Sequence, residues 1–511
     1  MPRYAAIDIG SNSVRMEAAE VVAGSTPVIL ATDREVTRLG VGVFSGGRIT
    51  EEATAFVCQV LTRMSQTYQR LDVAGVRAVA TSAVRDAGNQ AEFIQRVSAA
   101  LGAPVEIISG LEEARLIHRG VQSRWPHPDK RILIVDIGGG SAEIIAGENG
   151  EMQGGVSRPL GAVRLTEAFM KNDPPSETDL HGLEQFIDEK LDVAVKKIGI
   201  RPFDRAIGTS STAAAIVCAI NRIPRARREE AARLRATTPQ IRKLYKDLRV
   251  KDLSGRKKIG GIGPRRAEII VPGAAVLLKV LEAFRLPAVY YSSAGVRDGI
   301  IADLASRGVG RALTHLSREQ LLHVEGMAKK YNVQAKHTRR VALFAHQLFE
   351  WLQPLHKLAP EYGKLMEAAA HLLDTGHFIS SVAHHKHSAY IVQNSDMPGF
   401  TGRERNVVAA LCRFHRKALP SARYELVQSL PLEDKRAVTW LTPLLRIADG
   451  LDSGQEQKVE RMECQIKPSG VVVTVEGENI DLELWAAERA AESFRQIYES
   501  PLQFLRARRA P

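Results

Sequence analysis

Short apolar runs of strand length alternate with longer amphipathic stretches over the first part of the chain. Residues 4–7 and 76–80 have the length of buried strands, and residues 89–101 have the spacing of an amphipathic helix. Strands that alternate with helices are typical of α/β architecture, in which the sheet is largely buried. We therefore predict an α/β fold for this part of the chain.

A repeated motif divides the α/β part into two. The pattern Asp-Ile-Gly-x-x-Ser begins at Asp8 and occurs again at Asp136, 128 residues later. Each copy lies between two short apolar strands, as the turn of a β-hairpin rich in Gly, Ser and Asn does. Two copies predict two similar half-domains, which we place at residues 1–124 and 125–310.

After the second half-domain, the apolar residues follow a helical period almost throughout. Four such stretches are separated by Pro and Gly: 339–352, 365–373, 406–414 and 436–451. Strand-like runs return at 471–475 and 480–484, and a helix is predicted over 486–498. We predict an all-helical domain at 311–455 and a small α+β domain at 456–511.

Composition narrows the class of protein. The 511 residues are 44% hydrophobic and 25% charged, with a net charge of +12 and only 5% aromatic residues. Such a chain can attract a polyanion, but it offers few rings on which nucleic-acid bases could stack. No apolar stretch approaches the ~18 residues of a membrane span, and the four cysteines form no CxxC pair. We predict a cytoplasmic protein with free thiols, no nucleic-acid partner and no membrane insertion.

The positive charge is concentrated in one segment. The segment from Arg222 to Arg266 contains 16 Lys and Arg residues and four acidic residues. Its net charge is therefore +12, the same as that of the whole chain. A charged helix surface is the common meaning of such a run. Because the segment leads to Arg266 and contains a single aromatic residue, Tyr245, we interpret it as a track for a phosphate chain without bases. The residues assigned to this track are Arg256, Lys257 and Lys258.

The glycine-rich turns of the repeat suit a phosphoryl group. Glycines let backbone N–H groups converge on phosphate oxygens, neighbouring Ser or Asn side chains add donors, and an Asp at the strand end can hold Mg²⁺. Either turn alone is also explained as an ordinary tight turn. Two such loops facing each other across a cleft could hold one phosphoryl group from both sides.

Three further candidates for phosphate contact lie outside the repeat. The run Gly-Thr-Ser-Ser-Thr at 208–212 precedes an apolar helix, where hydroxyls and N–H groups form an anion site, although a simple helix cap explains it equally well. Arg85 and Arg266 are candidate clamps, with solvated surface arginines as the alternative.

A pair of glutamates marks the start of a predicted helix. Ser109 followed by Glu112 has the pattern of a capping box, which gives Glu112 a structural role. Glu113 remains in the first turn, where the helix dipole favours an ionised carboxylate that can act as a base. An exposed glutamate at such a position is more commonly structural than catalytic.

The helical part is rich in histidine. The order of its His and Asp residues is similar to that of the HD metal-dependent phosphohydrolases, whose ligands are His, an adjacent His-Asp pair and a late Asp. Leu373 stands where the paired His belongs, so we predict a structural or binding role rather than a competent metal centre. The residues concerned are His337, His371, Asp374, the His-His-Lys-His run at 384–387, and Asp449.

Several motifs together resemble the exopolyphosphatase / guanosine pentaphosphate phosphatase family, over essentially the whole chain. They lie at residues 6–13, 109–115, 135–143, 386–400 and 413–417. The resemblance implies duplicated actin-like (ribonuclease-H-like) halves that open and close around a cleft, with the HD-like domain of the longer members. It also implies Mg²⁺-dependent removal of a terminal phosphate, and a homodimer by analogy.

The resemblance assigns roles to individual residues. Glu113 matches the catalytic glutamate of the family, Asp136 and Glu143 match acidic residues near the metal, and Asp8 is a further candidate ligand. The family commonly has Gly where Ser211 stands, so the third loop differs here. The residues that match phosphate contacts are Asn12, Ser13, Arg85, Gly138, Gly139, Gly140, Ser141, Ser210, Ser211, Thr212 and Arg266.

The function predicted from these matches is an exopolyphosphatase that releases orthophosphate from inorganic polyphosphate, with Glu113 as the general base. The main alternative is a guanosine pentaphosphate (pppGpp) 5′-phosphatase, for which the sequence shows no recognisable guanine pocket. An actin-like fold also occurs in sugar and acetate kinases, but the Ser109–Arg115 motif favours the phosphatases. A non-catalytic protein that binds polyphosphate or guanosine tetra- and pentaphosphate is the remaining alternative.

Overall fold

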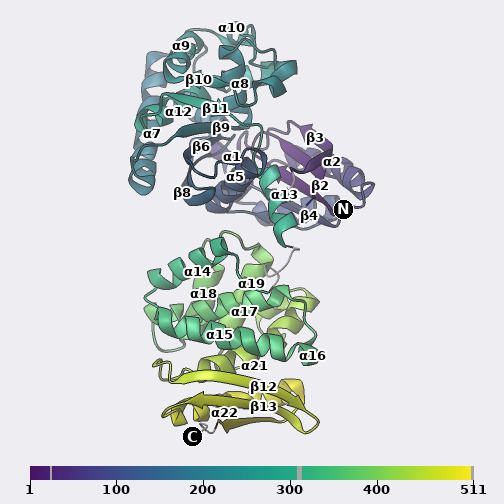
Figure 1. The fold of residues 1–511 in the computed structure, drawn as a ribbon. Helices are drawn as coiled ribbons and strands as arrows, with labels where there is room; N and C mark the ends of the chain where they lie inside the picture. Colours follow the sequence, from purple (N-terminus) through teal and green to yellow (C-terminus); the bar gives the residue numbers. More distant parts are fainter. Residues whose placement is uncertain (23–25, 308–313, 508–511) are drawn as a thin grey trace. The chain divides into compact units, whose positions relative to one another are not determined.

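The computed structural model describes residues 1–22, 26–307 and 314–507. Its contacts group the chain into two compact units, Met1–Ser306 and Arg307–Pro511 (Figure 1). The boundary predicted at residue 310 lies outside the described residues. Among the helices that are described, none combines the length and the hydropathy that a membrane crossing requires.

Two mixed sheets carry the first unit, in the strand orders β3-β2-β1-β4-β5 and β10-β11-β9-β6-β7-β8. In each sheet the strand before the repeated motif pairs antiparallel with the strand after it and parallel with a later strand. The duplicated α/β fold predicted from the repeat is therefore confirmed. The strands are β1 (Arg3–Ile9), β2 (Val14–Glu20), β3 (Val28–Glu35), β4 (Gly75–Ala80), β5 (Val105–Ile107), β6 (Arg131–Ile137), β7 (Ala142–Glu148), β8 (Glu151–Arg158), β9 (Arg205–Thr209), β10 (Arg235–Thr237) and β11 (Ala288–Tyr291).

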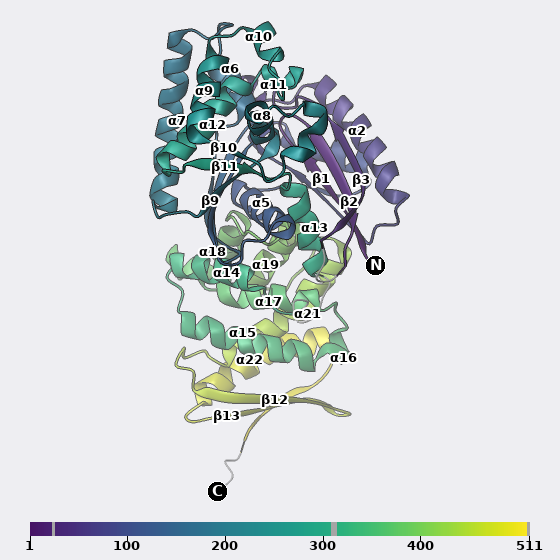
Figure 2. The same ribbon diagram turned by 45° about the horizontal axis from the view of Figure 1, so that its top comes forward.

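Helices cover both sheets and bury a separate apolar core against each of them. Figure 2 shows α7, α9 and α12 gathered beside the second sheet and α2 beside the first. The helices are α1 (Val43–Gly46), α2 (Glu51–Gln69), α3 (Ser82–Asp86), α4 (Gln90–Leu101), α5 (Gly110–Arg124), α6 (Ala162–Phe169), α7 (Glu177–Ile198), α8 (Ser210–Ile220), η1 (Arg225–Ala231), α9 (Thr238–Arg249), α10 (Leu253–Lys257), α11 (Pro264–Ala267), α12 (Ile270–Ala283) and α13 (Val296–Arg307).

Two of these helices pack on the opposite sheet from the one they follow in the chain. Helix α5 follows β5 of the first sheet, but its Ile117 is buried with Ile132 of the second sheet. Helix α13 follows β11 of the second sheet, and its Ile300 is buried with Ala6 of the first. The two helices touch closely, because a Cβ on Gly299 would lie 1.8 Å from a backbone oxygen of α5.

The second unit is helical up to residue 450 and ends in a three-stranded sheet of order β12-β13-β14. One hydrophobic cluster contains residues from Leu316 to Leu502, so the predicted division at 455 runs through a single core. The elements are α14 (Arg318–Lys330), α15 (Ala335–Trp351), α16 (Gln353–His356), α17 (Glu361–Leu372), η3 (Thr375–Phe378), α18 (His384–Gln393), α19 (Gly402–Phe414), α20 (Glu425–Gln428), α21 (Leu432–Gly450), β12 (Val459–Lys467), β13 (Gly470–Gly477), α22 (Asp481–Tyr498) and β14 (Leu502–Arg506).

The strand predicted at 480–484 is wrong, because these residues begin α22. Asp481 and Glu483 lie in its first turn, where the helix dipole favours acidic side chains. The buried residues Ala487, Ala491 and Phe494 continue at helical spacing. The short apolar run was therefore the start of an amphipathic helix, an ambiguity that periodicity cannot resolve over five residues.

Candidate active site

The two copies of the repeated motif form the same turn. The Gly10 N–H donates to the Ser13 carbonyl at 3.1 Å, and the Gly138 N–H donates to the Ser141 carbonyl at 3.0 Å. The two turns meet, because a Cβ on Gly139 would lie 3.3 Å from the Asn12 nitrogen. The structure thus brings the two predicted phosphate loops face to face, at a separation that requires glycine.

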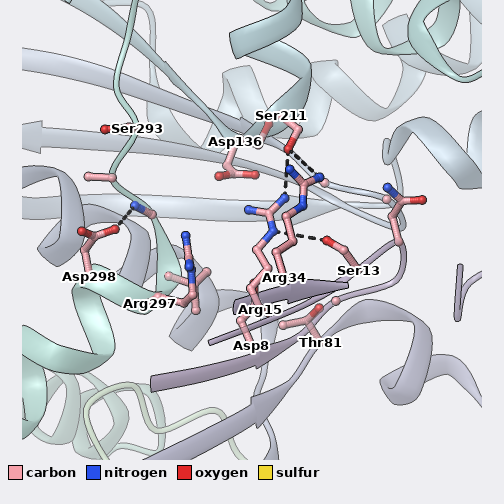
Figure 3. Close-up of a pocket in the computed structure, with 18 of the residues that line it drawn as sticks. Asp8, Ser13, Arg15, Arg34, Thr81, Asp136, Ser211, Ser293, Arg297 and Asp298 are labelled. Atoms are coloured by element: carbon pink, nitrogen blue, oxygen red, sulfur yellow. Dashed lines mark hydrogen bonds between the residues drawn. The ribbon is translucent and has the colours of Figure 1, made fainter. Parts of the chain in front are cut away.

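A cavity of about 370 Å³ opens between these loops (Figure 3). Both sheets contribute to it, together with the N-termini of α5 and α8 and the loop that precedes α13. The predicted site residues that line it are Asp8, Asn12, Ser13, Glu113, Asp136, Gly138, Gly139, Gly140, Ser141, Ser210, Ser211 and Arg266.

One wall of the cavity is acidic. Glu113 is buried, and its Oε2 atom has no hydrogen-bond partner. Burial, followed by the nearby charge of Glu143, raises the pKa of Glu113 well above its usual value. Burial and Asp136 likewise raise the pKa of Glu143 to about 7. Glu113 is therefore buried rather than exposed as predicted, and desolvation raises its pKa against the effect of the helix dipole.

The remaining acids of this wall come from the ends of β1 and β6. Burial raises the pKa of both Asp8 and Asp136. Asp136 accepts a hydrogen bond from the Thr209 hydroxyl, and Glu143, behind Glu113, accepts one from Ser157 at 2.8 Å. The wall therefore concentrates carboxylates whose negative charge the neighbouring groups only partly balance.

The facing wall is cationic. Arg15 donates to the Ser211 hydroxyl at 3.0 Å, and Arg34 donates to the same oxygen at 3.4 Å (Figure 3). Arg266 donates to Thr212 at 3.3 Å. Burial and the neighbouring arginines lower the pKa of Arg34 to about 9 and that of Arg266 to about 10. Among the described residues, none of these three arginines has a carboxylate within 4.0 Å, so the wall is suited to an anion.

The sequence prediction missed Arg15, Arg34 and the segment from Ser293 to Asp298, which includes the first residues of α13; all of them line the cavity. Arg15 and Arg34 lie directly opposite each other on β2 and β3. Like charges at such positions repel each other unless an anion lies between them. The alternation of polar and buried residues along β2 was the available signal, since Arg15 follows Ser13 on the same face.

Six predicted site residues lie outside the cavity lining: Arg85, Glu143, Thr212, Arg256, Lys257 and Lys258. Arg85 donates to the Ile108 carbonyl at 2.5 Å and lies 3.7 Å from the Glu113 carboxylate, so it holds Glu113. Thr212 donates to the Ile137 carbonyl, and Lys257 and Lys258 are exposed on the surface.

The assignment of Arg256 to an exposed phosphate track is wrong. Its guanidinium is buried and donates to the carbonyls of Lys251 and Ala267 and to the Asp173 carboxylate. Arg256 therefore ties α10 to its neighbouring loops, and it presents no donor to a ligand.

Glu112 also differs from its predicted role. The Ser109 side chain accepts a hydrogen bond from the Glu112 N–H, as predicted. The Glu112 carboxylate, however, belongs to a buried ion network rather than to a capping box. It accepts from Arg115 at 2.7 Å and from Arg77 at 3.0 Å, and both arginines also pair with Asp303 of α13.

The third loop, at the start of α8, has an unusual backbone. Ser210 has a φ of 70°, in the left-handed region that residues other than glycine seldom adopt. Its hydroxyl donates to the Ile137 carbonyl, which ties the loop to the end of β6. Ser211, where the family commonly has Gly, uses its hydroxyl to accept from both cavity arginines.

A second, smaller cavity of about 60 Å³ adjoins the first. The two share lining residues that include Arg34, Arg228 and Arg266, and the smaller one adds Arg225 and Arg265. None of its lining residues is aromatic or acidic. Together the two cavities form a path in which the cationic wall continues beyond the phosphate loops.

Known proteins match the chain over both units. The sequence pattern of the Ppx/GppA phosphatase family matches residues 18–307, and that of domain III of these phosphatases matches residues 320–488. The chain belongs to the Ppx/GppA phosphatase family. The members of this family are phosphatases, a class of hydrolases.

Individual Ppx/GppA relatives cover most of the chain or its first unit. This chain is 28% identical to the guanosine-5′-triphosphate,3′-diphosphate pyrophosphatase of Photobacterium profundum. The match extends over 421 residues, which are 82% of this chain and 82% of the relative. The PPX-GPPA enzyme of Aquifex aeolicus is 31% identical with a TM-score of 0.53, over 59% of this chain and 99% of that one. An exopolyphosphatase from Cytophaga hutchinsonii is 29% identical with a TM-score of 0.55, over 59% of this chain and 97% of that one.

Proposed function

We propose that this phosphatase hydrolyses inorganic polyphosphate from its end and releases orthophosphate. The observation that carries the proposal is the continuation of the arginine wall from the phosphate loops into the second cavity. A linear polyphosphate repeats its negative charge along its length and has no base to stack. Its terminal phosphate would lie at the loops, and the following phosphates would lie along Arg228, Arg225 and Arg265.

The reaction follows from the two walls. The glycine turns and Arg15 orient the terminal phosphoryl group and stabilise the charge that develops on it. Glu113 Oε2 accepts a proton from the attacking water, as the unpartnered atom of the acidic wall can do. The water oxygen bonds to phosphorus, the bond to the bridging oxygen breaks, and the shortened chain leaves as orthophosphate is released.

The acidic wall also fits Mg²⁺, because it holds a buried carboxylate oxygen without a partner and several acids with raised pKa. Mg²⁺ commonly binds one or two carboxylates together with substrate phosphates. Asp8 and Asp136 would hold the ion, and Glu143 adds negative charge behind them. When bound, Mg²⁺ neutralises charge on the phosphoryl group.

We expect phosphate release to depend on this ion. Removal of divalent cations with a chelator should reduce release from polyphosphate to background, and added Mg²⁺ should restore it. The measurement is a colorimetric phosphate assay on the full chain. Release that persists after complete removal of the metal would contradict the assignment of the acidic wall.

Guanosine pentaphosphate is the second candidate substrate. The Photobacterium profundum relative is named for that activity, and Tyr291 places one aromatic ring in the lining of the larger cavity. Parallel assays on long-chain polyphosphate and on guanosine pentaphosphate, with and without Mg²⁺, separate the two. A higher kcat/KM on the nucleotide would overturn the polyphosphate proposal, and binding without release from either substrate would favour the non-catalytic alternative.

Removal of arginine charges tests where the bound polyphosphate lies. The double variant Arg225→Gln, Arg265→Gln should weaken binding of long polyphosphate by about 10²–10⁴-fold, because each lost charge-assisted contact contributes about 1.5–3 kcal/mol and two are lost. The double variant Lys257→Gln, Lys258→Gln removes the same net charge from exposed residues outside both cavities. Binding measured at several salt concentrations should show a reduced salt dependence for the first pair. A larger effect of the lysine pair would move the path to the predicted surface track.

A further inference from the structure

A second cluster of ionisable side chains lies in the helical part of the second unit. Asp374 follows α17, His377 lies in η3, and His384 is the first residue of α18. Within the described ranges, these three form the one group of three or more His, Cys, Asp or Glu whose ligand atoms all lie within 4.8 Å of one another. The cluster lies outside the phosphatase cavities.

The separations between these atoms fit a shared ion. Asp374 Oδ1 is 3.6 Å from His377 Nε2 and 3.7 Å from His384 Nε2. Ligands about 2.0–2.2 Å from a tetrahedral Zn²⁺ are about 3.4 Å apart. The side chain of His377 is 44% exposed, which leaves a route by which an ion can reach the buried ligands.

A buried histidine directed at the same carboxylate provides an independent observation. His337 is 2% exposed and its Nδ1 atom bonds to Asp452 at 2.9 Å. Its Nε2 atom has no hydrogen-bond partner and faces Asp374 Oδ2 at 3.6 Å and Asp449 Oδ1 at 3.5 Å. A carboxylate on one ring nitrogen with the other directed into a cluster is the arrangement typical of metal-binding histidines.

A close contact between two histidines also supports a cation at this cluster. His384 Nε2 lies 3.1 Å from His415 Nε2, while His415 Nδ1 bonds to the Cys412 carbonyl at 2.7 Å. Because a carbonyl oxygen can only accept, His415 Nδ1 carries the proton of that bond. With its proton on Nδ1, His415 directs a lone pair from Nε2 toward His384, and a cation between the rings and Asp374 would satisfy it.

We propose that Asp374 Oδ1, His377 Nε2 and His384 Nε2 bind a divalent transition-metal ion, such as Zn²⁺ or Co²⁺. Imidazole ligands favour these ions over Mg²⁺, which prefers oxygen. The prediction of no competent metal centre was based on Leu373, which stands where the paired His belongs. In this site the imidazole nitrogens would come instead from His377 of η3 and His384 of α18. His337 Nε2 lies 3.6 Å from the other oxygen of Asp374 and 3.5 Å from Asp449, which places a further ring nitrogen beside the proposed site.

Metal content of the full chain tests this proposal. The protein is stripped with a chelator and dialysed against Zn²⁺ in excess Mg²⁺, and the bound zinc is measured by mass spectrometry. We expect about one tightly bound Zn²⁺ per chain, and Co²⁺ should give visible absorption bands typical of nitrogen ligation. His384→Gln and the more conservative Asp374→Asn should both lose this binding.

Two controls make the outcome decisive. His387→Gln removes a histidine from the same helix but outside the cluster and should bind zinc like the wild type. Glu113→Gln should also retain the zinc, which separates this site from the phosphatase cavity. Circular dichroism identifies any variant that fails to fold. Absence of zinc from the wild type, or equal zinc in folded wild type, His384→Gln and Asp374→Asn, would overturn the proposal and leave a metal-free ionic network.

Discussion

Replacement of Glu113 by Gln is expected to lower kcat by about 10²–10⁴-fold, the usual contribution of a general base. Gln keeps the size and polarity of the side chain but cannot accept a proton from water at Oε2. The KM for substrate should change little, because the loops and arginines that hold the phosphate are untouched. Steady-state phosphate release and equilibrium binding measure the two effects separately.

Glu52→Gln is the matched control for this prediction. Glu52 also lies in the first turn of a helix, α2, but it is exposed and far from the cavity lining. Its replacement should leave kcat at the wild-type value. Near-normal turnover in Glu113→Gln would remove Glu113 from the mechanism, and an equal loss in both variants would show that first-turn charge matters rather than the site.

Replacement of Arg115 by Met is expected to lower the free energy of unfolding by about 3–5 kcal/mol, the cost of removing one partner from a buried ion pair. Arg115 is 1% exposed and pairs with Glu112 at 2.7 Å and Asp303 at 2.9 Å. Its loss removes these short ion pairs of the buried Glu112 and Asp303, which keep Arg77 at 3.0 and 3.2 Å, and Asp303 also keeps Arg119 at 3.8 Å. Urea unfolding followed by circular dichroism measures the change.

Arg242→Met is the matched control, because it removes an arginine from an exposed ion pair with Glu282 at 2.8 Å. Such a pair contributes about 0–1 kcal/mol. If the two variants lose the same stability, the buried network has no special role. A stable Arg115→Met variant with reduced kcat would instead show that the network serves to position Glu113, its neighbour in α5.

The sequence was sufficient where a local rule decides the structure. The repeat at Asp8 and Asp136 predicted both hairpins and the cleft between them, because glycine turns and flanking strands are encoded within a few residues. Glu113 was separated from Glu112 by the capping pattern of Ser109 and Glu112, which assigned Glu112 a structural role and left Glu113 as the candidate base. Its burial was not predictable, since the groups that desolvate it come from distant parts of the chain.

Long-range contacts explain the other differences between the predicted and the observed site. Arg15 and Arg34 become site residues only when β2 pairs with β3 and Ser211 approaches from α8. Arg256 has the surroundings of a surface cation in the sequence, but Asp173, 83 residues away, accepts its hydrogen bond. The identity of a basic residue does not show whether its charge is already balanced within the fold.

The packing of α5 between the two sheets decides how the groups of the site are connected to each other. Glu113 lies on a helix whose Ile117 packs on the second sheet and whose Leu116 packs on the first. The neighbouring Glu112 also pairs with Arg77 of β4 in the first sheet. Asp8, Arg15 and Arg34 lie on three paired strands of the first sheet, whereas Asp136 lies on the second. The catalytic carboxylate is thus anchored to both halves, and a substitution that loosens α5 from either sheet would shift Glu113 relative to the acids and the arginines.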